Sequence, residues 1–256
     1  MAWDPEQYLK FAQPRLRPAV DLLARIALEA PRSVYDLGCG AGNVTRLLAA
    51  RWPDAAITGV DDSAAMLEEA ARVPSRIVWR KQSVGEWAPD APAELIYSNA
   101  ALHWLPDHTT VFSRLMRTLA PHGVLAVQMP RNFAAPSHTL VAATVRSGPW
   151  QRRLEHLLRP APVNEPRFYY GILAPLAASV DIWESEYLQP LRGDDPVKEF
   201  VKGSYLKQFL DALDTPERTA FEDQYAMRVH EAYPPEADGT TLFPFRRLFI
   251  VATRGS

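Results

Sequence analysis

The sequence predicts an α/β fold in which a mainly parallel, seven-stranded sheet carries helices on both faces. From residue 33 to residue 129, short apolar segments of strand composition alternate with segments whose apolar residues recur at helical spacing. A strand–helix–strand order requires right-handed crossovers, which make successive strands parallel and place helices on both sides of the sheet. After Pro130 the pattern changes to helices and loops, followed by two more strands.

The first half of the chain supplies the parallel part of the predicted sheet. Its strands are expected at 33–37, 56–60, 77–81, 94–98 and 123–129. Its helices are expected at 4–11, at 16–29, at 43–51, after Asp62 or Ser63 (either of which can cap the helix), and at 108–119. Pro14 is expected to separate the first two helices, because proline interrupts helical hydrogen bonding. Pro121 and Gly123 are expected to end the last one.

The second half supplies two further strands and a helical part. Segments 180–188 and 246–253 have strand patterns, and we expect them to pair and to form an antiparallel edge of the sheet. Helices are expected within 131–178 and, in at least two pieces, within 195–233. No linker or repeat interrupts the chain, so we predict one domain. Its parts are N-terminal helices (1–30), a ligand-binding core (31–130), and a helical lid over the carboxyl edge of the sheet with the last two strands (131–256).

Composition and charge narrow the class of protein. The chain has 256 residues, a net charge of −2 and a pI of about 6.3, which argues against a nucleic-acid-binding protein with a basic face. Cys39 is the only cysteine, so an intrachain disulfide and a cysteine-built zinc site are excluded, and we expect no metal. Neither a secretory signal nor a run of about 18 apolar residues is present, so we expect a cytoplasmic protein without a membrane partner.

The segment VYDLGCGAGN at 34–43 leads from the first predicted strand into a glycine-rich loop. In open α/β sheets, ligands bind beyond the carboxyl ends of the strands, where the strand order reverses. Gly38, Gly40 and Gly42 alternate, and glycine lets the backbone adopt positive φ angles and approach a ligand closely. A dinucleotide loop would need a third glycine where Asn43 stands. A phosphate-binding P-loop is also excluded, because no Gly-Lys-Ser/Thr is present.

Two acids indicate the kind of ligand that suits this loop. Asp36 precedes the glycines, where it would repel a diphosphate but favour an ammonium or sulfonium group. Asp61, followed by Asp62, ends the second predicted strand, where a carboxylate can accept hydrogen bonds from both hydroxyls of a ribose. Either acid alone could simply cap a loop. Together, at successive strand ends beside the glycines, they favour S-adenosylmethionine as the cofactor.

Further candidate residues come after the other strands. The expected adenine contacts, two apolar faces and one polar edge, are Met66, Val84 and Ser83. Asn99 and Leu102, after the fourth strand, are expected beside the methionine half of the cofactor. His103 is open to three interpretations: a substrate ligand, a general base, or a loop histidine bonded to the backbone.

With these residues, the chain resembles the class I S-adenosylmethionine-dependent methyltransferases. DLGCGAG at 36–42 matches their first motif, and GVDDS at 59–63 matches their second. The resemblance implies a Rossmann-like fold and binding of S-adenosylmethionine. Where relatives often carry an acid that reads adenine, this chain has Ser83, which implies a weaker contact.

Within this class, the chain is most similar to the trans-aconitate methyltransferase family. The stretches that carry this resemblance spread over almost the whole sequence: YLKF (8–11), RPAVDLLAR (17–25), DLGCGAGN (36–43), RWPDAAITGVDDS (51–63), LHWLPDH (102–108), GVLAVQMP (123–130), YYGIL (169–173), VDIW (180–183) and RLFIVA (247–252). The resemblance implies a small-molecule polycarboxylate substrate and monomethyl esterification of trans-aconitate.

Methyl transfer to a carboxylate would need little acid–base chemistry. A carboxylate with a pKa near ~4 is already ionised at neutral pH, so no base is obligatory, and in-line displacement needs chiefly alignment and exclusion of water. The other carboxylates of the acceptor require basic or hydroxyl side chains. The candidates are Tyr8, Arg15, Arg17, His103, Arg131, Tyr170 and Arg246. Tyr169 is adjacent to Tyr170 on one predicted helix, so at most one of the two lines the site.

Two other functions stay open from the sequence. A methyltransferase acting on a neutral phenol or quinone-ring carbon would need a base, for which His103 is the candidate, and would have an apolar acceptor pocket. A non-catalytic protein could instead bind the cofactor as a signal and respond through its helical part. A nicotinamide-dependent dehydrogenase is disfavoured by Asn43.

Overall fold

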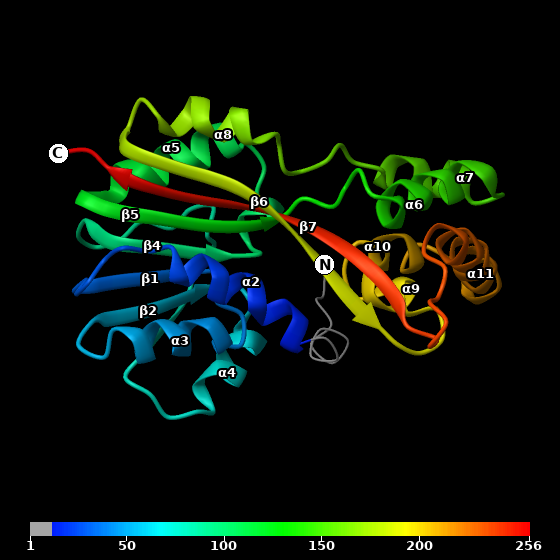
Figure 1. Ribbon diagram of the computed structural model, residues 1–256, viewed down its shortest axis with the longest axis horizontal. Coiled ribbons are helices and arrows are strands. Elements are labelled where there is room, and N and C mark those ends of the chain that lie inside the picture. The colour runs from blue at the N-terminus through cyan, green and yellow to red at the C-terminus, as the bar shows by residue number, and fades with distance from the viewer. Residues whose placement is uncertain (1–11) are drawn as a thin grey trace. The chain divides into compact units, whose positions relative to one another are not determined.

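The computed structural model describes residues 12–256 and, from residue 16 onward, their side chains. Within residues 12–256, seven strands form one sheet in the order β3-β2-β1-β4-β5-β7-β6 (Figure 1). The strands are β1 (Ser33–Leu37), β2 (Ala56–Asp61), β3 (Val78–Lys81), β4 (Ala93–Asn99), β5 (Leu119–Pro130), β6 (Ala177–Leu191) and β7 (Thr241–Arg254). Strands β1 to β5 pair in parallel, and β7 pairs antiparallel to β5. The predicted fold class is therefore confirmed, including its antiparallel edge.

The helices follow the predicted order, with shifted ends at several points. The described helices are α2 (Ala12–Ala24), α3 (Asn43–Arg51), α4 (Ala64–Ala71), α5 (His108–Thr118), α6 (Pro136–Ser147), α7 (Gln151–Leu154), α8 (Pro166–Leu173), α9 (Pro196–Lys202), α10 (Lys207–Leu210) and α11 (Thr215–Ala232). The helix predicted at 4–11 lies outside the described residues. The break predicted at Pro14 is wrong, because this proline lies in the first turn of α2, where backbone N–H groups need no intrahelical partner.

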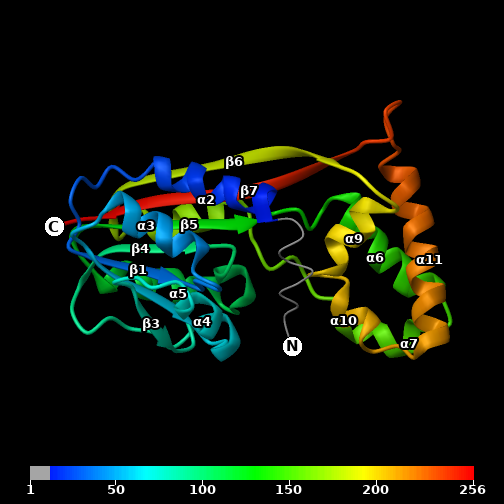
Figure 2. The same ribbon diagram turned by 90° about the horizontal axis from the view of Figure 1, so that it is seen from below.

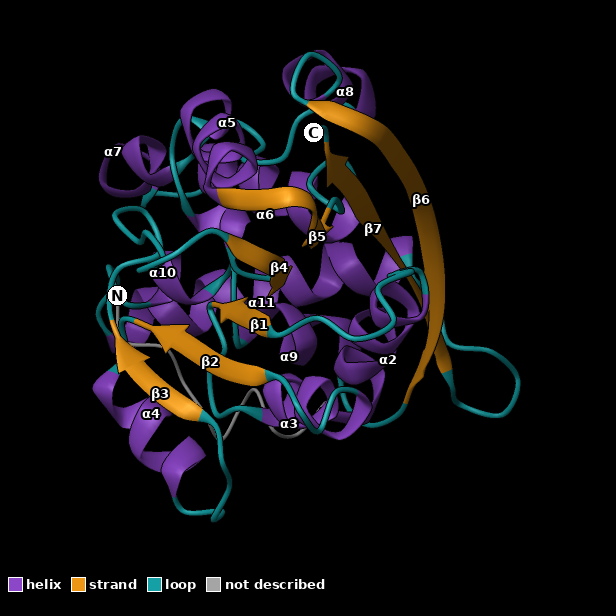
Figure 3. Ribbon diagram, turned by 90° about the vertical axis from the view of Figure 1, so that its left-hand side faces the viewer, coloured by secondary structure: helices purple, strands orange, loops and turns teal. Residues whose placement is uncertain are grey.

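Each face of the sheet is covered by helices (Figure 3). On the side of α2 and α3, the hydroxyl of Tyr97 on β4 donates a hydrogen bond to the carbonyl of Ala19 in α2 at 2.8 Å. On the side of α5 and α8, the rings of Phe112 and Tyr169 lie 4.9 Å apart. These three aromatic side chains are fully buried. Both helical layers are thus fixed to the sheet by large core residues, which holds the strand ends in place.

The chain divides into two compact units. The sheet unit contains Leu16–Pro130, Pro162–Ser185 and Arg247–Ser256. The helical unit contains Arg131–Ala161 and Glu186–Arg246, with the segment that ends at Arg15. Strands β6 and β7 each run from one unit into the other. The assignment of 1–256 to one domain, with the helices as a lid, stays a prediction.

The helical unit has an apolar core of its own. Its helices α6, α7, α9, α10 and α11 gather into one group, in which α6 lies beside α11 (Figure 2). The rings of Trp150 and Phe221 meet edge to face at 5.2 Å, and those of Phe200 and Phe243 also lie 5.2 Å apart. All four side chains are buried in this core. The segments after Pro130 therefore form a packed unit, since buried aromatic rings contribute strongly to stability.

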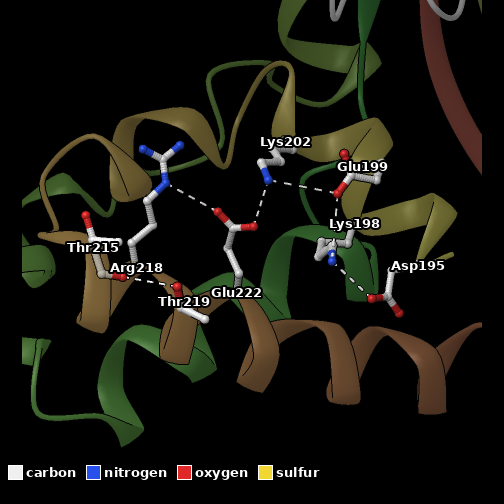
Figure 4. Close-up of polar contacts among 8 residues, drawn as sticks. All are labelled: Asp195, Lys198, Glu199, Lys202, Thr215, Arg218, Thr219 and Glu222. Carbon is white, nitrogen blue, oxygen red and sulfur yellow. Dashed lines mark hydrogen bonds and ion pairs between the residues drawn. The ribbon is translucent and has the colours of Figure 1, made fainter.

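An ion pair between Lys202 and Glu222 joins α9 to α11 within the helical unit, and further ion pairs lie beside it (Figure 4). Glu222 of α11 lies between Lys202 of α9, at 2.7 Å, and Arg218, at 3.4 Å. Lys198 of α9 pairs with Asp195 at 3.0 Å. Burial opposes the ionisation of Glu222, but the hydrogen bonds and charges of Lys202 and Arg218 lower its pKa below the usual value. A partly buried network of this kind fixes the register of two helices better than a single exposed pair does.

The described part of the chain contains neither a membrane span nor a metal site. No helix within residues 12–256 is long and apolar enough to cross a bilayer. Among the same residues, His, Cys, Asp and Glu side chains nowhere form a group of three that could hold a metal ion.

Candidate active site

The glycine loop joins β1 to α3 where the strand order reverses, between β1 and β4. The amides of Gly38 and Cys39 both donate to the carbonyl of Val60 on β2, at 2.8 and 3.0 Å. Gly38, Gly40 and Gly42 all have positive φ angles, of 76°, 53° and 75°. Residues with a Cβ rarely adopt these angles, so the backbone conformation of the loop explains why its glycines alternate.

Close packing requires glycine at two of these positions, whereas the third has open space. A Cβ at Gly38 would lie 2.1 Å from the Cβ of Ala101, and one at Gly42 would lie 2.4 Å from Cη2 of Trp79. A Cβ at Gly40 would have no neighbour within 4 Å among the described residues. The loop is therefore closely packed at Gly38 and Gly42 and has free space at Gly40. Free space of this kind would let a ligand approach the backbone.

Asp61 connects the end of β2 to the glycine loop. Its Oδ2 accepts a hydrogen bond from the amide of Gly40 at 2.8 Å, and its Oδ1 accepts one from the amide of Ser63 at 2.9 Å. Of the two predicted caps of α4, Ser63 is the one observed, because its hydroxyl accepts a hydrogen bond from the amide of Met66 at 3.3 Å. Asp62 lies exposed between them. The structure thus places Asp61, from the second motif, in contact with the glycine loop of the first motif.

Asp36 is the acid on β1 that precedes the loop, and only 2% of its surface is exposed. Its Oδ2 accepts a hydrogen bond from the hydroxyl of Thr45 at 2.6 Å. Burial raises the pKa of Asp36 to about 7, an effect that the Thr45 hydrogen bond opposes and the charge of Asp61 adds to. A cation nearby would favour the ionised form. Thr45 was not foreseen from the sequence, although its place in the first turn of α3 was a signal for such a contact.

The candidate adenine residues lie after β2 and β3. Met66 is buried in the first turn of α4. Ser83 is exposed and Val84 is half-buried, both just after β3. The ring of Trp79, which sequence reasoning missed, lies 2.5 Å from where a Cβ at Gly59 would be. The glycine at position 59 of β2 therefore makes room for the indole of Trp79.

The end of β4 carries an unsatisfied polar group. Asn99 is the last residue of this strand, and its buried Oδ1 has no hydrogen-bond partner among the described residues. Ala100 comes next with a positive φ of 54°, and its amide donates to the carbonyl of Gln128 at 2.9 Å. Leu102 is buried in the single 3-10 turn after it. A buried oxygen without a donor at a strand end is a feature of a ligand site, because such groups are otherwise nearly always paired.

His103 lies in the same turn, with 7% of its surface exposed. Its Nδ1 is buried and has no hydrogen-bond partner within the described part of the chain. Burial, together with the smaller effects of the charges of Arg247 and His108, lowers the pKa of His103 to about 3. The imidazole is therefore neutral at pH 7. Its ring lies 4.6 Å from the exposed ring of Trp104.

The candidate acceptor residues fall in different parts of the chain. Tyr8 lies outside the described residues, as does the side chain of Arg15. Arg17 is exposed on α2 in the sheet unit. Arg131 and Arg246 belong to the helical unit, where the amide of Arg131 donates to the carbonyl of Arg246 at 2.9 Å.

The two adjacent tyrosines of α8 differ in their surroundings. Tyr170 is 56% exposed, whereas Tyr169 is fully buried. The hydroxyl of Tyr169 lies 2.7 Å from Nδ1 of His108 and accepts a hydrogen bond from the amide of Asn164 at 3.1 Å. Tyr169 is thus part of the core between α5 and α8, and of this pair only Tyr170 has an accessible ring.

Two buried polar residues were missed by sequence reasoning: Gln128 near the carboxyl end of β5, and Arg247 on the neighbouring strand β7. Adjacent arginines on β7 face opposite sides: Arg246 is exposed and pairs with Glu186 at 3.6 Å, while Arg247 is 6% exposed. Nη1 of Arg247 donates to Oε1 of the fully buried Gln128 at 3.4 Å. The signal was the alternation of strand side chains, which turns one of two successive arginines toward the core.

Comparisons with known proteins show the family to which the chain belongs. A methyltransferase domain family matches residues 8–171. Proteins named trans-aconitate 2-methyltransferase match almost the whole chain: that of Azoarcus sp. is 46% identical and covers 98% of this chain and 99% of its own length, and that of Pseudomonas aeruginosa is 45% identical and covers 99% and 94%. Among solved structures, the YcgJ protein of Bacillus has a TM-score of 0.59 at 13% identity, covering 94% of this chain and 99% of its own.

The chain therefore belongs to the class I S-adenosylmethionine-dependent methyltransferases. Within that class, its relatives over the full length include proteins named trans-aconitate 2-methyltransferase. S-adenosylmethionine is the cofactor, and the residues present fit it. Gly40 has open space around it, Asp61 at the end of β2 is a carboxylate that could accept hydrogen bonds from a ribose, and the unsatisfied oxygen of Asn99 could accept one more.

Proposed function

We propose that this enzyme transfers the methyl group of S-adenosylmethionine to a carboxylate of trans-aconitate, which gives a monomethyl ester and S-adenosylhomocysteine. The observation that carries the proposal is the 46% identity to a trans-aconitate 2-methyltransferase over 98% of the chain. This likeness includes residues 172–256, which lie beyond the match to the general methyltransferase domain. Cofactor binding does not demand likeness there, so a shared acceptor is the better explanation.

The cofactor, when bound, supplies an electrophilic methyl group on a positively charged sulfur. We assign Asp61 to the ribose hydroxyls, Asp36 to the positive charge, and Gly40 to close backbone contact. These assignments are supported by the burial of Asp36 and by the open space at Gly40. The other residues proposed to bind the cofactor are Gly38, Gly42, Asp62, Met66, Ser83, Val84, Asn99 and Leu102.

The residues around the acceptor are proposed to align it and to exclude water, without removing a proton. A carboxylate with a pKa near ~4 is ionised at neutral pH and needs no base. His103, whose pKa burial lowers to about 3, is a weak base at pH 7. As a neutral ring it can still donate one hydrogen bond to a carboxylate. This property supports a binding role for His103.

Methylation of a neutral phenol or ring carbon, with His103 as base, is the second candidate function. The buried Nδ1 without a partner favours it, since a base needs a free nitrogen. The low pKa of His103 argues against it, because burial holds that value at about 3. A buried arginine next to this site also suits an anionic acceptor better than an apolar one.

A polycarboxylate acceptor has further charges that basic or hydroxyl side chains must meet. Besides His103, the residues proposed for this purpose are Tyr8, Arg15, Arg17, Arg131, Tyr170 and Arg246. We also propose that the reaction takes place in the cytoplasm, where a single unpaired cysteine is stable.

Incubation of the purified protein with methyl-labelled S-adenosylmethionine and trans-aconitate tests the proposal. The expected product carries label that mild base releases as methanol, which identifies a methyl ester. Tricarballylate, which lacks the double bond, and a phenol serve as comparison acceptors. Labelling of the phenol with trans-aconitate left unmodified would establish the second candidate function instead.

A further inference from the structure

Three polar side chains share one face of the sheet at the carboxyl ends of neighbouring strands. Asn99 on β4 is paired in register with Gln128 on β5, so their side chains lie on the same face. Gln128 is paired with Phe249 on β7, and Arg247 is two residues from Phe249, so Arg247 lies on this face as well. The hydrogen bond of 3.4 Å between Nη1 of Arg247 and Oε1 of Gln128 agrees with this placement.

Buried polar atoms without partners concentrate at the same strand ends. Nε2 of Gln128 and Nδ1 of His103 have no hydrogen-bond partner among the described residues, and neither does Oδ1 of Asn99. Gln128 is fully buried and His103 nearly so. More than about nine in ten buried polar groups in proteins are hydrogen-bonded. Three unsatisfied groups on adjacent elements therefore indicate that a polar ligand forms the missing hydrogen bonds at these strand ends.

The charge at these strand ends indicates which kind of ligand would bind there. Arg247 brings a buried guanidinium to them, and this positive charge is near enough to lower the pKa of His103, after burial itself. The amide Nε2 of Gln128 can only donate hydrogen bonds, and a neutral imidazole can donate one. A guanidinium and neutral N–H donors are the kinds of group that bind a carboxylate.

We propose that Arg247, together with Gln128 and His103, binds a carboxylate of the acceptor. This assignment rests on the proposed methylation of a polycarboxylate and adds a specificity residue to it. The position suits the reaction, because β4 is the neighbour of β1 on the side of the sheet away from β2 and β3, and β5 and β7 follow it in the strand order. The acceptor site would therefore adjoin the part of the cofactor site that Asn99 borders.

Replacement of Arg247 by Met tests the assignment, because Met keeps an unbranched apolar stem and removes the charge. With trans-aconitate as varied substrate, the KM is expected to rise at least about tenfold, as loss of a charge-assisted fork implies. The dissociation constant of S-adenosylhomocysteine, measured by calorimetry, is expected to stay within about twofold. Arg76→Gln is the matched control, since Arg76 is exposed before the amino end of β3 and its loss is expected to change neither value.

A second variant keeps the test decisive if Arg247→Met does not fold. Gln128→Glu places an internal carboxylate next to Arg247, where it would compete with that of the acceptor. The expected result is again a rise of at least about tenfold in the KM for trans-aconitate, with the cofactor affinity retained. A KM within about twofold of the wild-type value in a folded variant that still binds cofactor would overturn the assignment.

Failure of this assignment and failure of the proposed function give different results. If the wild-type protein does not methylate trans-aconitate, the proposed function is wrong. Calorimetric binding of trans-aconitate to the S-adenosylhomocysteine complex then tests Arg247 without turnover. Binding by the wild type that Arg247→Met weakens would still support a carboxylate site, and no binding by the wild type, or equal binding by both proteins, would refute it.

Discussion

The carboxylate of Asp61, at the end of β2, accepts a hydrogen bond from the amide of Gly40 in the loop after β1, at 2.8 Å. This contact joins two sequence motifs that lie at neighbouring strand ends. The same carboxylate also accepts a hydrogen bond from the amide of Ser63, at 2.9 Å. An acid here therefore shapes the glycine loop before any ligand arrives, and its remaining lone pairs can receive the ribose.

Replacement of Asp61 by Asn should weaken cofactor binding. The amide offers one acceptor oxygen and no charge, so it cannot serve both Gly40 and a ribose as well as a carboxylate can. Loss of charge-assisted hydrogen bonds of about 2 kcal/mol predicts a dissociation constant for S-adenosylhomocysteine roughly thirtyfold higher, measured by calorimetry. Asp54→Asn, at an exposed position before β2, is the control. An unchanged affinity in Asp61→Asn would remove this residue from the cofactor site.

Alanine substitutions at Gly38 and Gly40 should separate stability from binding. In Gly38→Ala the new Cβ would meet that of Ala101 at 2.1 Å, in addition to the strain of a positive φ, so a loss of about 2–4 kcal/mol of stability is expected. Gly40→Ala meets no atom and should lose only about 1–2 kcal/mol from φ strain. The Cβ at Gly40 should nevertheless block the cofactor. Chemical denaturation and calorimetry measure both effects, and tight cofactor binding by Gly40→Ala would contradict the placement.

The raised pKa of Asp36 predicts a dependence of cofactor affinity on pH. Burial raises this pKa to about 7, so the carboxyl group is largely protonated at pH 6 and ionised at pH 8. A positively charged ligand favours the ionised form, and S-adenosylmethionine should therefore bind more tightly at pH 8 than at pH 6. Asp36→Asn should bind weakly and equally at both values. Calorimetry at the two pH values decides, and a wild-type affinity that falls with rising pH would contradict the role of Asp36.

The same group should affect the stability of the ligand-free protein with the opposite sign. Its pKa is about 7 when folded and about 4 when unfolded, so between these values the native state binds more protons. The contribution of Asp36 to stability is thus complete below pH 4 and is lost as pH rises through 7, by about 4 kcal/mol. Thermal denaturation should show Asp36→Asn gaining stability relative to the wild type between pH 5 and pH 8. An equal difference at all pH values would show that Asp36 does not titrate in this range.

Replacement of His103 by Gln distinguishes a ligand from a base. If the neutral imidazole only donates a hydrogen bond to the acceptor, Gln can replace it, and the KM should rise about three- to tenfold while kcat changes little. Steady-state kinetics with trans-aconitate measure this split. A general base would instead be revealed by a loss of about a hundredfold or more in kcat. The pKa of about 3 caused by burial also predicts that activity will not show a His103 titration near pH 6.

The regular elements of the fold could be predicted from the sequence because each has a local cause. The strands and helices from 33 to 118 follow the spacing of apolar residues, and the cap at Ser63 follows from its hydroxyl at a helix start. The break predicted at Pro14 is wrong because the effect of a proline depends on its position in a helix, and a proline in the first turn removes no intrahelical hydrogen bond.

The cofactor loop was also predictable, since Gly38, Gly40 and Gly42 are dictated by their own φ angles. The buried contact between Gln128 and Arg247 was not predictable in this way. Arg246 and Arg247 are equivalent in the sequence, and only the register of β7 against β5 shows which one enters the core beside Gln128. Such pairing is a long-range property that residue types alone do not determine.

The most direct test of the central claim is the chemical identity of the methylated product. After incubation with S-adenosylmethionine and trans-aconitate, proton NMR and mass spectrometry should show one added methyl group as a methoxy ester. Arg247→Met should form the same ester, but only at a much higher concentration of trans-aconitate. A methyl group on carbon or on a phenol oxygen of another acceptor, with trans-aconitate recovered unchanged, would contradict the account.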